Sequence, residues 1–349
     1  MTRQLRNRRR RVLGAVLTLL VLALTSCGHT NLPQDALDPR GHYSRTTYNL
    51  IVPVFVVAGV VFVLVQGLIL YSVIRFRRRS EDEAPKQVHG NTRLEITWTV
   101  LPFLTLLVIA VFTVVGIVQL SHRPKGPNVV EVNVTGHQWW WELNYPGYGV
   151  TTANELHVPT HQPVDIALTS VDVIHNFWPP KLAGKIYAIP NHLNHMTLEA
   201  DEPGVYYGQC AEFCGLSHAN MRFRVVAQTP EDFQAWAAAN RTDSPANASY
   251  ALPDPETQAD ANAGAVLFRT KGCAGCHSIT GYSAGKVGPN LTHLDQRTVF
   301  AGALFDLNDN NLRNWLRDPP GVKPGSKMPN LNLSEDDITK LIAYLDTLK

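Results

Sequence analysis

Two cysteines, a histidine and a methionine lie within twelve positions of one another near the middle of the chain. Cys210, Cys214, His218 and Met221 are spaced four, four and three residues apart, and His175 lies upstream. Soft sulfur donors mixed with imidazole favour copper or zinc over hard ions. The two thiolates could both bind the same pair of metal ions. A redox metal held in this way would make the chain an electron-transfer protein.

A structural zinc ion is the main alternative for this cluster. The two cysteines and two histidines could together form a Cys₂His₂ zinc site. That assignment leaves Met221, and Glu212 between the cysteines, without a role. A lipid-anchored protein that binds zinc or copper without transferring electrons is a further alternative.

A second motif lies near the C-terminal end, where residues 273–277 read Cys-Ala-Gly-Cys-His. This is the spacing of covalent c-type haem attachment. Cys273 and Cys276 can add to the two vinyl groups of the haem, and His277 can reach the iron from one face. Residues 257–349 resemble a class I cytochrome c domain.

Met328 and His293 compete for the other face of the iron. Met328 follows a loop rich in glycine and proline and precedes the last predicted helix, which matches the placement of the methionine in that family, so we favour it. His/Met ligation raises the reduction potential relative to two histidines. Such a haem would suit a donor to a copper centre.

The N-terminal residues predict export. Six arginines between Arg3 and Arg11 precede an apolar run from Val12 to Leu24, and Cys27 follows Leu-Thr-Ser. A basic start, a short apolar core and a small-residue exit are typical of a secretory signal, here residues 1–26. The position of the cysteine resembles a bacterial lipoprotein signal and predicts acylation of Cys27. An ordinary signal peptide or an uncleaved anchor is the alternative.

Two apolar runs of 25 residues, Leu50 to Ile74 and Ile96 to Leu120, predict membrane spans at residues 48–74 and 94–120. At 1.5 Å per residue each covers about 37 Å, enough to cross a hydrocarbon core of about 30 Å. The loop 75–93 opens with four arginines in five residues and is therefore predicted to be cytoplasmic. Both ends of the hairpin then face outward from a bacterial inner membrane. Residues 27–47 and the residues after 120 are predicted to lie on this outer side.

The sequence after the spans changes character twice. Residues 121–229 contain short β-rich runs between turn residues, which predict a small antiparallel sandwich or barrel; the runs are 129–135, 164–168, 196–198 and 223–227. Residues 230–256 start as an amphipathic stretch and continue as a linker rich in Ala, Asn, Asp and Pro. In the haem segment, helices are predicted at 258–270, 309–317 and 334–348, the last with a capping pair of Ser334 and Asp337.

Charge and cysteine content narrow the function further. The chain has 31 basic and 29 acidic residues, a balance that does not indicate nucleic-acid binding. Four of its five cysteines form two close pairs, each beside a histidine. Because each pair has a specific use as a ligand or attachment site, we predict no structural disulfide.

The segments Val-Ile-His-Asn-Phe-Trp at 173–178 and Cys-Ala-Glu-Phe-Cys-Gly-Leu-Ser-His-Ala-Asn-Met at 210–221, with the two spans, resemble subunit II of haem–copper cytochrome c oxidase. The resemblance covers about residues 48–236. It implies a cupredoxin sandwich with a binuclear CuA centre. Cys210 and Cys214 would bridge the two coppers, and His175 and His218 would each bind one of them. Met221 would be a weak axial ligand of one copper, and the Glu212 carbonyl would bind the other. It also implies a magnesium ion bound by the Glu212 carboxylate at the boundary with subunit I.

The resemblance implies roles for two further residues. Within Gly-His-Gln-Trp-Trp-Trp-Glu at 136–142, Trp139 would be the point where electrons enter, while Trp140 and Trp141 would mostly pack. Glu95 would stand at the entrance of a proton pathway into subunit I. The simpler interpretations are interface anchoring for the tryptophans and a solvated helix-terminal charge for Glu95. Five other histidines are predicted as non-ligands: His137, His157, His161, His192 and His195.

The complete hypothesis is a multidomain chain: a transmembrane α-helical hairpin, an all-β cupredoxin sandwich and an all-α cytochrome c domain. It would be the electron-accepting subunit of a terminal oxidase, a proton-translocating enzyme that is not catalytic through this chain alone. Its haem c would pass electrons to CuA and on to subunit I, where O₂ becomes water. Expected partners are subunits I and III, the membrane, and soluble cytochrome c or a quinol:cytochrome c reductase as donor.

Two other enzyme assignments compete with this hypothesis. Subunit II of a quinol oxidase has a similar fold with structural duties only, but such relatives lack the copper ligands, all of which are present here. Nitrous oxide reductase shares CuA but needs a propeller domain, for which this chain has no room.

Overall fold

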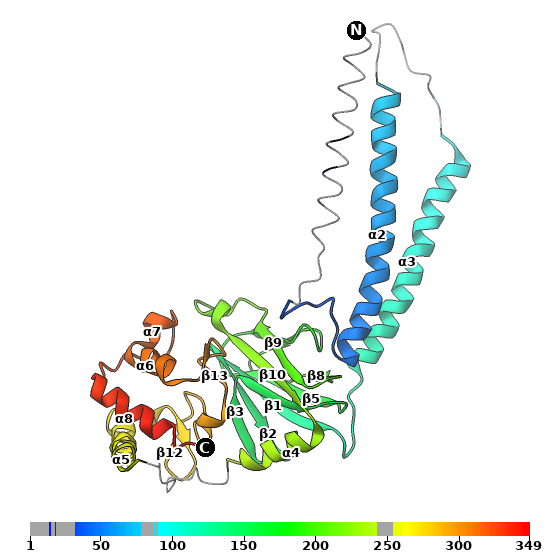
Figure 1. The fold of residues 1–349 in the computed structure, drawn as a ribbon. Helices are drawn as coiled ribbons and strands as arrows, with labels where there is room; N and C mark the ends of the chain where they lie inside the picture. The colour runs from blue at the N-terminus through cyan, green and yellow to red at the C-terminus, as the bar shows by residue number, and fades with distance from the viewer. Residues whose placement is uncertain (1–13, 15–17, 19–31, 78–86, 88–89, 243–253) are drawn as a thin grey trace.

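The computed structural model describes residues 14, 18, 32–77, 87, 90–242 and 254–349. Cys27, most of the predicted lipoprotein signal, most of the predicted cytoplasmic loop and part of the predicted linker lie outside the described residues. A helical hairpin projects from a β-sandwich, and a smaller helical region packs on another side of that sandwich (Figure 1).

The hairpin consists of α2 (His42–Arg75) and α3 (Thr92–Ser121). Both helices are long and apolar enough to cross a membrane, and almost none of their side chains in these apolar windows is buried by the protein. Apolar surface of this extent requires lipid or another apolar partner. The outer end of α2 is fixed to the sandwich by Ser44, whose hydroxyl donates to the Lys181 carbonyl at 2.8 Å.

The sandwich contains two five-stranded sheets. The first has the order β3-β2-β1-β5-β8 and the second β4-β10-β9-β6-β7. The bounds are β1 Val130–His137, β2 Trp140–Tyr145, β3 Val150–Ala153, β4 Glu155–Pro159, β5 Val164–Ser170, β6 His175–Trp178, β7 Ile186–Ala188, β8 Asn194–Leu198, β9 Gly204–Cys210 and β10 Arg222–Gln228.

The predicted β-sandwich is confirmed, but the expectation that it is antiparallel was wrong for two strand pairs. Strands β1 and β5 pair in parallel, with Val134 opposite Leu168, and so do β4 and β10. Parallel neighbours cannot be joined by a tight turn and need a longer connection. Here β2 to β4 intervene between β1 and β5, a separation that the local sequence pattern does not reveal.

The core of the sandwich is filled by aliphatic and aromatic side chains from both sheets. Along β1 buried and exposed residues alternate, as a strand with one face on a core requires. Trp141, Phe177 and Phe223 are fully or almost fully buried, and the rings of Phe177 and Phe223 stack with centroids 3.8 Å apart. Helix α4 (Pro230–Ala239) adds Phe233 to the same core.

The C-terminal part has a separate core made mainly by helices. These are α5 (Pro255–Thr270), α6 (Asp309–Arg317), α7 (Pro319–Val322) and α8 (Glu335–Leu345), with short ladders β11–β12 (Ser278–Ile279, Ser283–Ala284) and β13–β14 (Val299–Phe300, Phe305–Asp306). Single 3₁₀ turns lie at His218–Asn220, Cys273–Gly275 and Leu294–Gln296. The capping pair predicted for α8 is confirmed, since Ser334 and Asp337 bond to each other's backbone amides.

Candidate metal centre and cofactor cavity

Neighbouring strands of the second sheet bring the sulfur and imidazole residues together. Strand β6 begins at His175 and β9 ends at Cys210, and the two strands pair with Phe177 opposite Cys210. The chain then turns through residues 211–217 and returns as β10. Cys214 lies on this turn, and His218 and Met221 follow just before β10 begins.

The predicted copper ligands form one connected cluster. The two sulfur atoms, Cys210 Sγ and Cys214 Sγ, lie 3.8 Å apart. Cys210 Sγ lies 3.9 Å from His175 Nδ1 and 3.3 Å from the Glu212 carbonyl oxygen. Cys214 Sγ lies 3.6 Å from His218 Nδ1 and 3.9 Å from Met221 Sδ. Each sulfur has its own imidazole neighbour and one further donor. This division fits two bridged metal ions better than one zinc ion, which would need both imidazoles at the same point.

The two thiols influence each other's ionisation strongly. A hydrogen bond from Cys214 lowers the pKa of the Cys210 thiol, whereas the neighbouring Cys210, together with burial, raises the pKa of the Cys214 thiol. A second thiolate beside the first is unfavourable unless a cation is present. The pair is therefore suited to metal ions, which would replace the shared proton and allow both sulfurs to be thiolates.

The ring of His175 is fixed on two sides. A Cβ on Gly136 would lie 2.7 Å from His175 Cδ2, so only glycine allows the ring to approach this closely. Asp172 Oδ1 lies 2.9 Å from His175 Nε2. A carboxylate bonded to the remote nitrogen fixes the tautomer and raises the basicity of a metal-binding histidine.

Sequence reasoning missed Asp172, although an acid three residues before a ligand histidine was a usable signal. Burial raises the pKa of Asp172, but hydrogen bonds from His175 and from the Gln138 and Val173 amides outweigh it and lower the pKa to about 2. The carboxylate also lies 3.3 Å from Lys327 Nζ of the C-terminal part. Asp172 thus links the imidazole ligand to the neighbouring domain.

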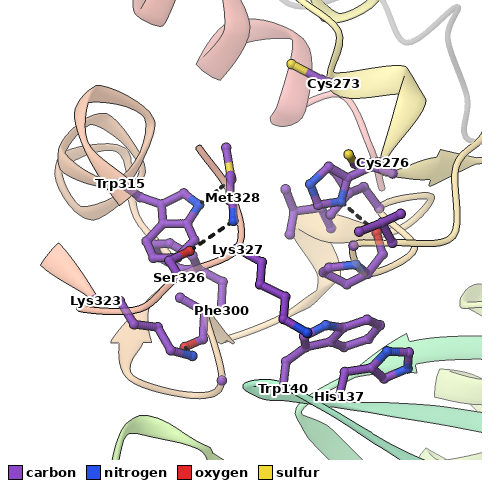
Figure 2. Close-up of a pocket in the computed structure, with 18 of the residues that line it drawn as sticks. His137, Trp140, Cys273, Cys276, Phe300, Trp315, Lys323, Ser326, Lys327 and Met328 are labelled. Carbon is purple, nitrogen blue, oxygen red and sulfur yellow. Dashed lines mark hydrogen bonds between the residues drawn. The ribbon is translucent and has the colours of Figure 1, made fainter. Parts of the chain in front are cut away.

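A cavity of about 500 Å³ opens beside the second motif. Its lining is mostly apolar and includes Cys273, Cys276, His277 and Met328. In Figure 2, Cys276 and Met328 lie on one side of the cavity, and His137 and Trp140, which come from the sandwich, lie on the other. The lining supplies two thiols for covalent attachment and two candidate iron ligands, as a c-type haem requires.

His277 is held in a single ring orientation. Its Nδ1 lies 2.9 Å from the Pro289 carbonyl, so Nε2 remains for a metal. A Cβ on Gly288 would lie 2.5 Å from His277 Cε1, so a larger residue there would displace the ring. Burial lowers the pKa of His277, which favours the neutral imidazole that binds iron.

The two candidates for the other iron ligand have different surroundings. Both ring nitrogens of His293 are engaged, Nδ1 at 2.7 Å from the Lys349 carbonyl and Nε2 at 2.8 Å from the Arg241 carbonyl. Met328 lines the cavity, and its Sδ accepts a hydrogen bond from Trp315 Nε1 at 3.2 Å. The geometry favours Met328.

The three consecutive tryptophans have three different surroundings. Trp141 packs in the sandwich core as predicted. Trp140, expected mostly to pack, also lines the cavity, with its ring stacked on His137 at 4.1 Å. Trp139 is 9% exposed, and its Nε1 donates to the Cys214 carbonyl at 3.1 Å. A Cβ on Gly325 of the C-terminal part would lie 3.1 Å from the Trp139 ring, so this indole lies between the copper-ligand turn and the other domain.

The remaining predicted residues have less specific surroundings. Glu95 is exposed in the first turn of α3, where its carboxylate accepts from the Asn91 amide at 3.2 Å. Glu212 is half-buried on the ligand turn. Among the described residues, the donor cluster contains none of the five histidines predicted as non-ligands; His157, for example, stacks on Trp236.

Sequence profiles of three families match consecutive parts of the chain. The profile described as the cytochrome c oxidase subunit II transmembrane domain matches residues 34–115, and that of the periplasmic domain matches residues 149–228. The cytochrome c profile matches residues 261–349.

The chain is also similar to individual proteins. Cytochrome c oxidase subunit 2 of Alkalihalophilus pseudofirmus is 40% identical over 340 residues, which are 95% of this chain and 96% of that protein. Quinol oxidase subunit 2 of Bacillus cereus is 34% identical over 205 residues, 57% of this chain and 70% of the relative. A crystal structure of the periplasmic domain of subunit II of cytochrome oxidase from Bradyrhizobium japonicum is 32% identical and covers 34% of this chain and 95% of its own, with a TM-score of 0.32.

Proposed function

The chain belongs to the cytochrome c oxidase subunit II family, and from this premise we propose that it accepts electrons at a haem c and delivers them through a CuA centre to subunit I. It is one part of a haem–copper terminal oxidase and is not catalytic alone. In the assembled enzyme, O₂ is reduced to water at subunit I, with proton translocation across the membrane.

The observation that carries this proposal is the connected set of donors around Cys210 and Cys214. Both sulfurs are buried, they lie 3.8 Å apart, and each has a separate imidazole within 4 Å. We assign the copper ligands to His175, Cys210, the Glu212 carbonyl, Cys214, His218 and Met221. When bound, the bridged copper pair supplies a one-electron carrier whose charge is shared by two metals.

The fold itself sets the positions of these donors. Strands β6 and β9 and the turn between β9 and β10 hold the ligands, and Asp172 orients His175. Little rearrangement is then needed when the electron arrives, which lowers the barrier to transfer. Trp139, bonded to the Cys214 carbonyl, is the proposed contact through which electrons reach the copper ligands.

In the C-terminal part, Cys273 and Cys276 would attach the haem, and His277 and Met328 would bind its iron. All four residues line the same cavity, and the Pro289 carbonyl holds His277 with one nitrogen left for the metal. When bound, the haem supplies the one-electron couple that receives electrons from outside. The apolar walls exclude water and favour the neutral ligands.

Three further roles belong to the proposal. The Glu212 carboxylate would bind magnesium at the boundary with subunit I, because hard cations prefer oxygen ligands. Glu95 would stand at the entrance of a proton pathway into subunit I. Cys27 would carry the lipid of a processed N-terminus.

The chain is anchored in a membrane by its two apolar helices and carries a periplasmic domain. As a subunit II it works in a complex with subunit I. We propose that the membrane is the bacterial cell membrane, that subunit III is also present, and that the donor is a soluble cytochrome c or a quinol:cytochrome c reductase.

Metal analysis and spectroscopy of the purified full-length chain test this proposal. We expect two copper ions and one haem per chain, and an EPR spectrum in which one unpaired electron is shared by two coppers. In the purified complete oxidase, His277→Ala should stop haem-dependent turnover and leave the copper spectrum intact.

Two results would contradict the proposal. Zinc in place of copper would make the cluster a structural site. Unchanged oxidation of reduced haem c in the His277→Ala enzyme would show that this histidine is not needed for the relay. His161→Ala, at an exposed histidine outside the cluster, is the matched control and should change neither spectrum.

A further inference from the structure

A lysine of the C-terminal part reaches into the sandwich and ends beside Trp139. Lys323 is 4% exposed. Its Nζ lies 2.7 Å from the Trp139 carbonyl and 2.7 Å from the Ala301 carbonyl. One side chain therefore joins a backbone group of each domain, and Lys323 and Trp139 also line the same cavity.

The turn at residues 301–303 fits closely against the same place. The Arg222 amide donates to the Gly302 carbonyl at 2.9 Å, across the boundary between the domains. A Cβ on Gly302, whose φ is +78°, would lie 2.8 Å from both the Trp139 and the Asn220 carbonyl oxygens. These contacts leave no space for a larger residue.

We propose that Lys323 is the positioning residue that fixes the haem domain over Trp139, and that this docking closes the Trp139 surface to soluble donors. Electrons from outside then reach the copper ligands only through the haem domain. The inference rests on the proposed function, because it specifies how the two electron carriers are held relative to each other.

The physical reason is the cost of a buried polar group without a partner. Removing the amine leaves two carbonyl groups in a buried contact with their hydrogen bonds unmade, which costs more than the bonds themselves contribute. An interface loosened in this way no longer holds the carriers at a fixed separation. Electron transfer is then slower even though both metal sites are intact.

The test compares Lys323→Met with Lys340→Met in the purified complete oxidase. Lys340 belongs to the same domain but forms an exposed ion pair with Asp336. After rapid photoreduction of haem c, we expect electron transfer to the copper centre to slow about tenfold or more in Lys323→Met, since small misplacements have effects of this size. Protection of the Arg222 amide against hydrogen exchange should fall as well. Lys340→Met should match the wild type in both measurements.

Haem and copper spectra decide whether each variant has folded. Gly302→Ala, which crowds the same contact without removing a charge, should also slow the transfer, and both variants should allow a soluble donor to reduce copper directly. Wild-type rates and Arg222 protection in both variants would overturn the inference. Absence of haem-to-copper transfer in the wild type would instead refute the proposed function itself.

Discussion

The copper-ligand cluster and the haem cavity are built in opposite ways. Around Cys210 and Cys214 the donor atoms already lie within 4 Å of their neighbours, and the sandwich behind them has its own complete core. Around His277 the ligands instead line a cavity of about 500 Å³. The first site consists of mostly buried side chains at one end of a domain with a packed core, whereas the second is a domain whose centre must be filled by its cofactor.

This difference shows how the two carriers depend on the protein. In the sandwich, paired strands set the positions of the proposed copper ligands. The haem domain needs attachment of the haem in order to complete its core.

The largest effect is expected from preventing haem attachment with the double variant Cys273→Ser/Cys276→Ser. At about 24 cal/mol per Å³, an empty cavity of about 500 Å³ would cost on the order of 12 kcal/mol. A domain is stable by only about 5–15 kcal/mol in total. Calorimetry should therefore show no cooperative unfolding of the C-terminal part, while the sandwich transition remains. A retained C-terminal transition in haem-free protein would contradict this view.

Removal of the copper sulfurs should have a smaller effect on folding. We expect Cys210→Ser/Cys214→Ser to lose copper completely but to keep the sandwich transition, with the free energy of unfolding lowered by about 1–3 kcal/mol, as is typical of a buried substitution. Circular dichroism and calorimetry would measure this. Unfolding of the sandwich would show that the metal, rather than the strands, organises the site.

Glu155 tests the interface between the two domains. This β4 carboxylate is 1% exposed and accepts bonds from the Thr298 amide, at 3.1 and 3.0 Å, and from the Thr298 hydroxyl. Glu155→Ala leaves a buried amide unpaired and should weaken docking by about 1–3 kcal/mol. Arg222 amide protection would report the change. Asp306→Ala, which removes an exposed ion pair with Arg224, should cost at most about 1 kcal/mol.

Replacement of Asp172 tests whether this carboxylate orients the proposed copper ligand His175. Replacement by Asn keeps the shape but weakens the bond that orients His175. Loss of such an orienting group typically lowers metal affinity about 10–100-fold. Copper competition titrations would measure this, and the sandwich should remain folded. Wild-type copper affinity would mean that Asp172 serves only its contact with Lys327.

The last prediction is a pH dependence of docking. Burial lowers the pKa of Lys323 to about 7, although the electrostatic interaction with Cys214 raises it in part. An undocked Lys323 would have its ordinary pKa near 10.5. The docked state releases the Lys323 proton more easily, so docking should strengthen as the pH rises above 7. The docking equilibrium constant should increase by at most about tenfold per pH unit. Below pH 7 this group should not change it.

Protection of the Arg222 amide, corrected for intrinsic exchange, would follow this dependence. Lys323→Met should abolish it. A wild-type protein whose docking weakens between pH 7 and 9 would contradict the sign of the effect.

Local spacing made several features predictable. The proposed copper ligands from Cys210 to Met221 lie within twelve positions of one another, and the haem motif occupies five consecutive residues, so each could be recognised without any knowledge of the fold. The two spans followed from uninterrupted apolar length, and the α8 capping pair from a three-residue interval. In each case the physical requirement acts between residues that are close in sequence.

The tertiary structure decided what depends on distant residues. It paired β1 with β5 in parallel, engaged both nitrogens of His293 with backbone carbonyls, and placed Asp172 beside His175. It also brought Trp140 to the haem cavity and Lys323 to Trp139, contacts between residues more than a hundred positions apart. No short sequence pattern encodes such contacts, because they arise only when two separately formed cores pack against each other.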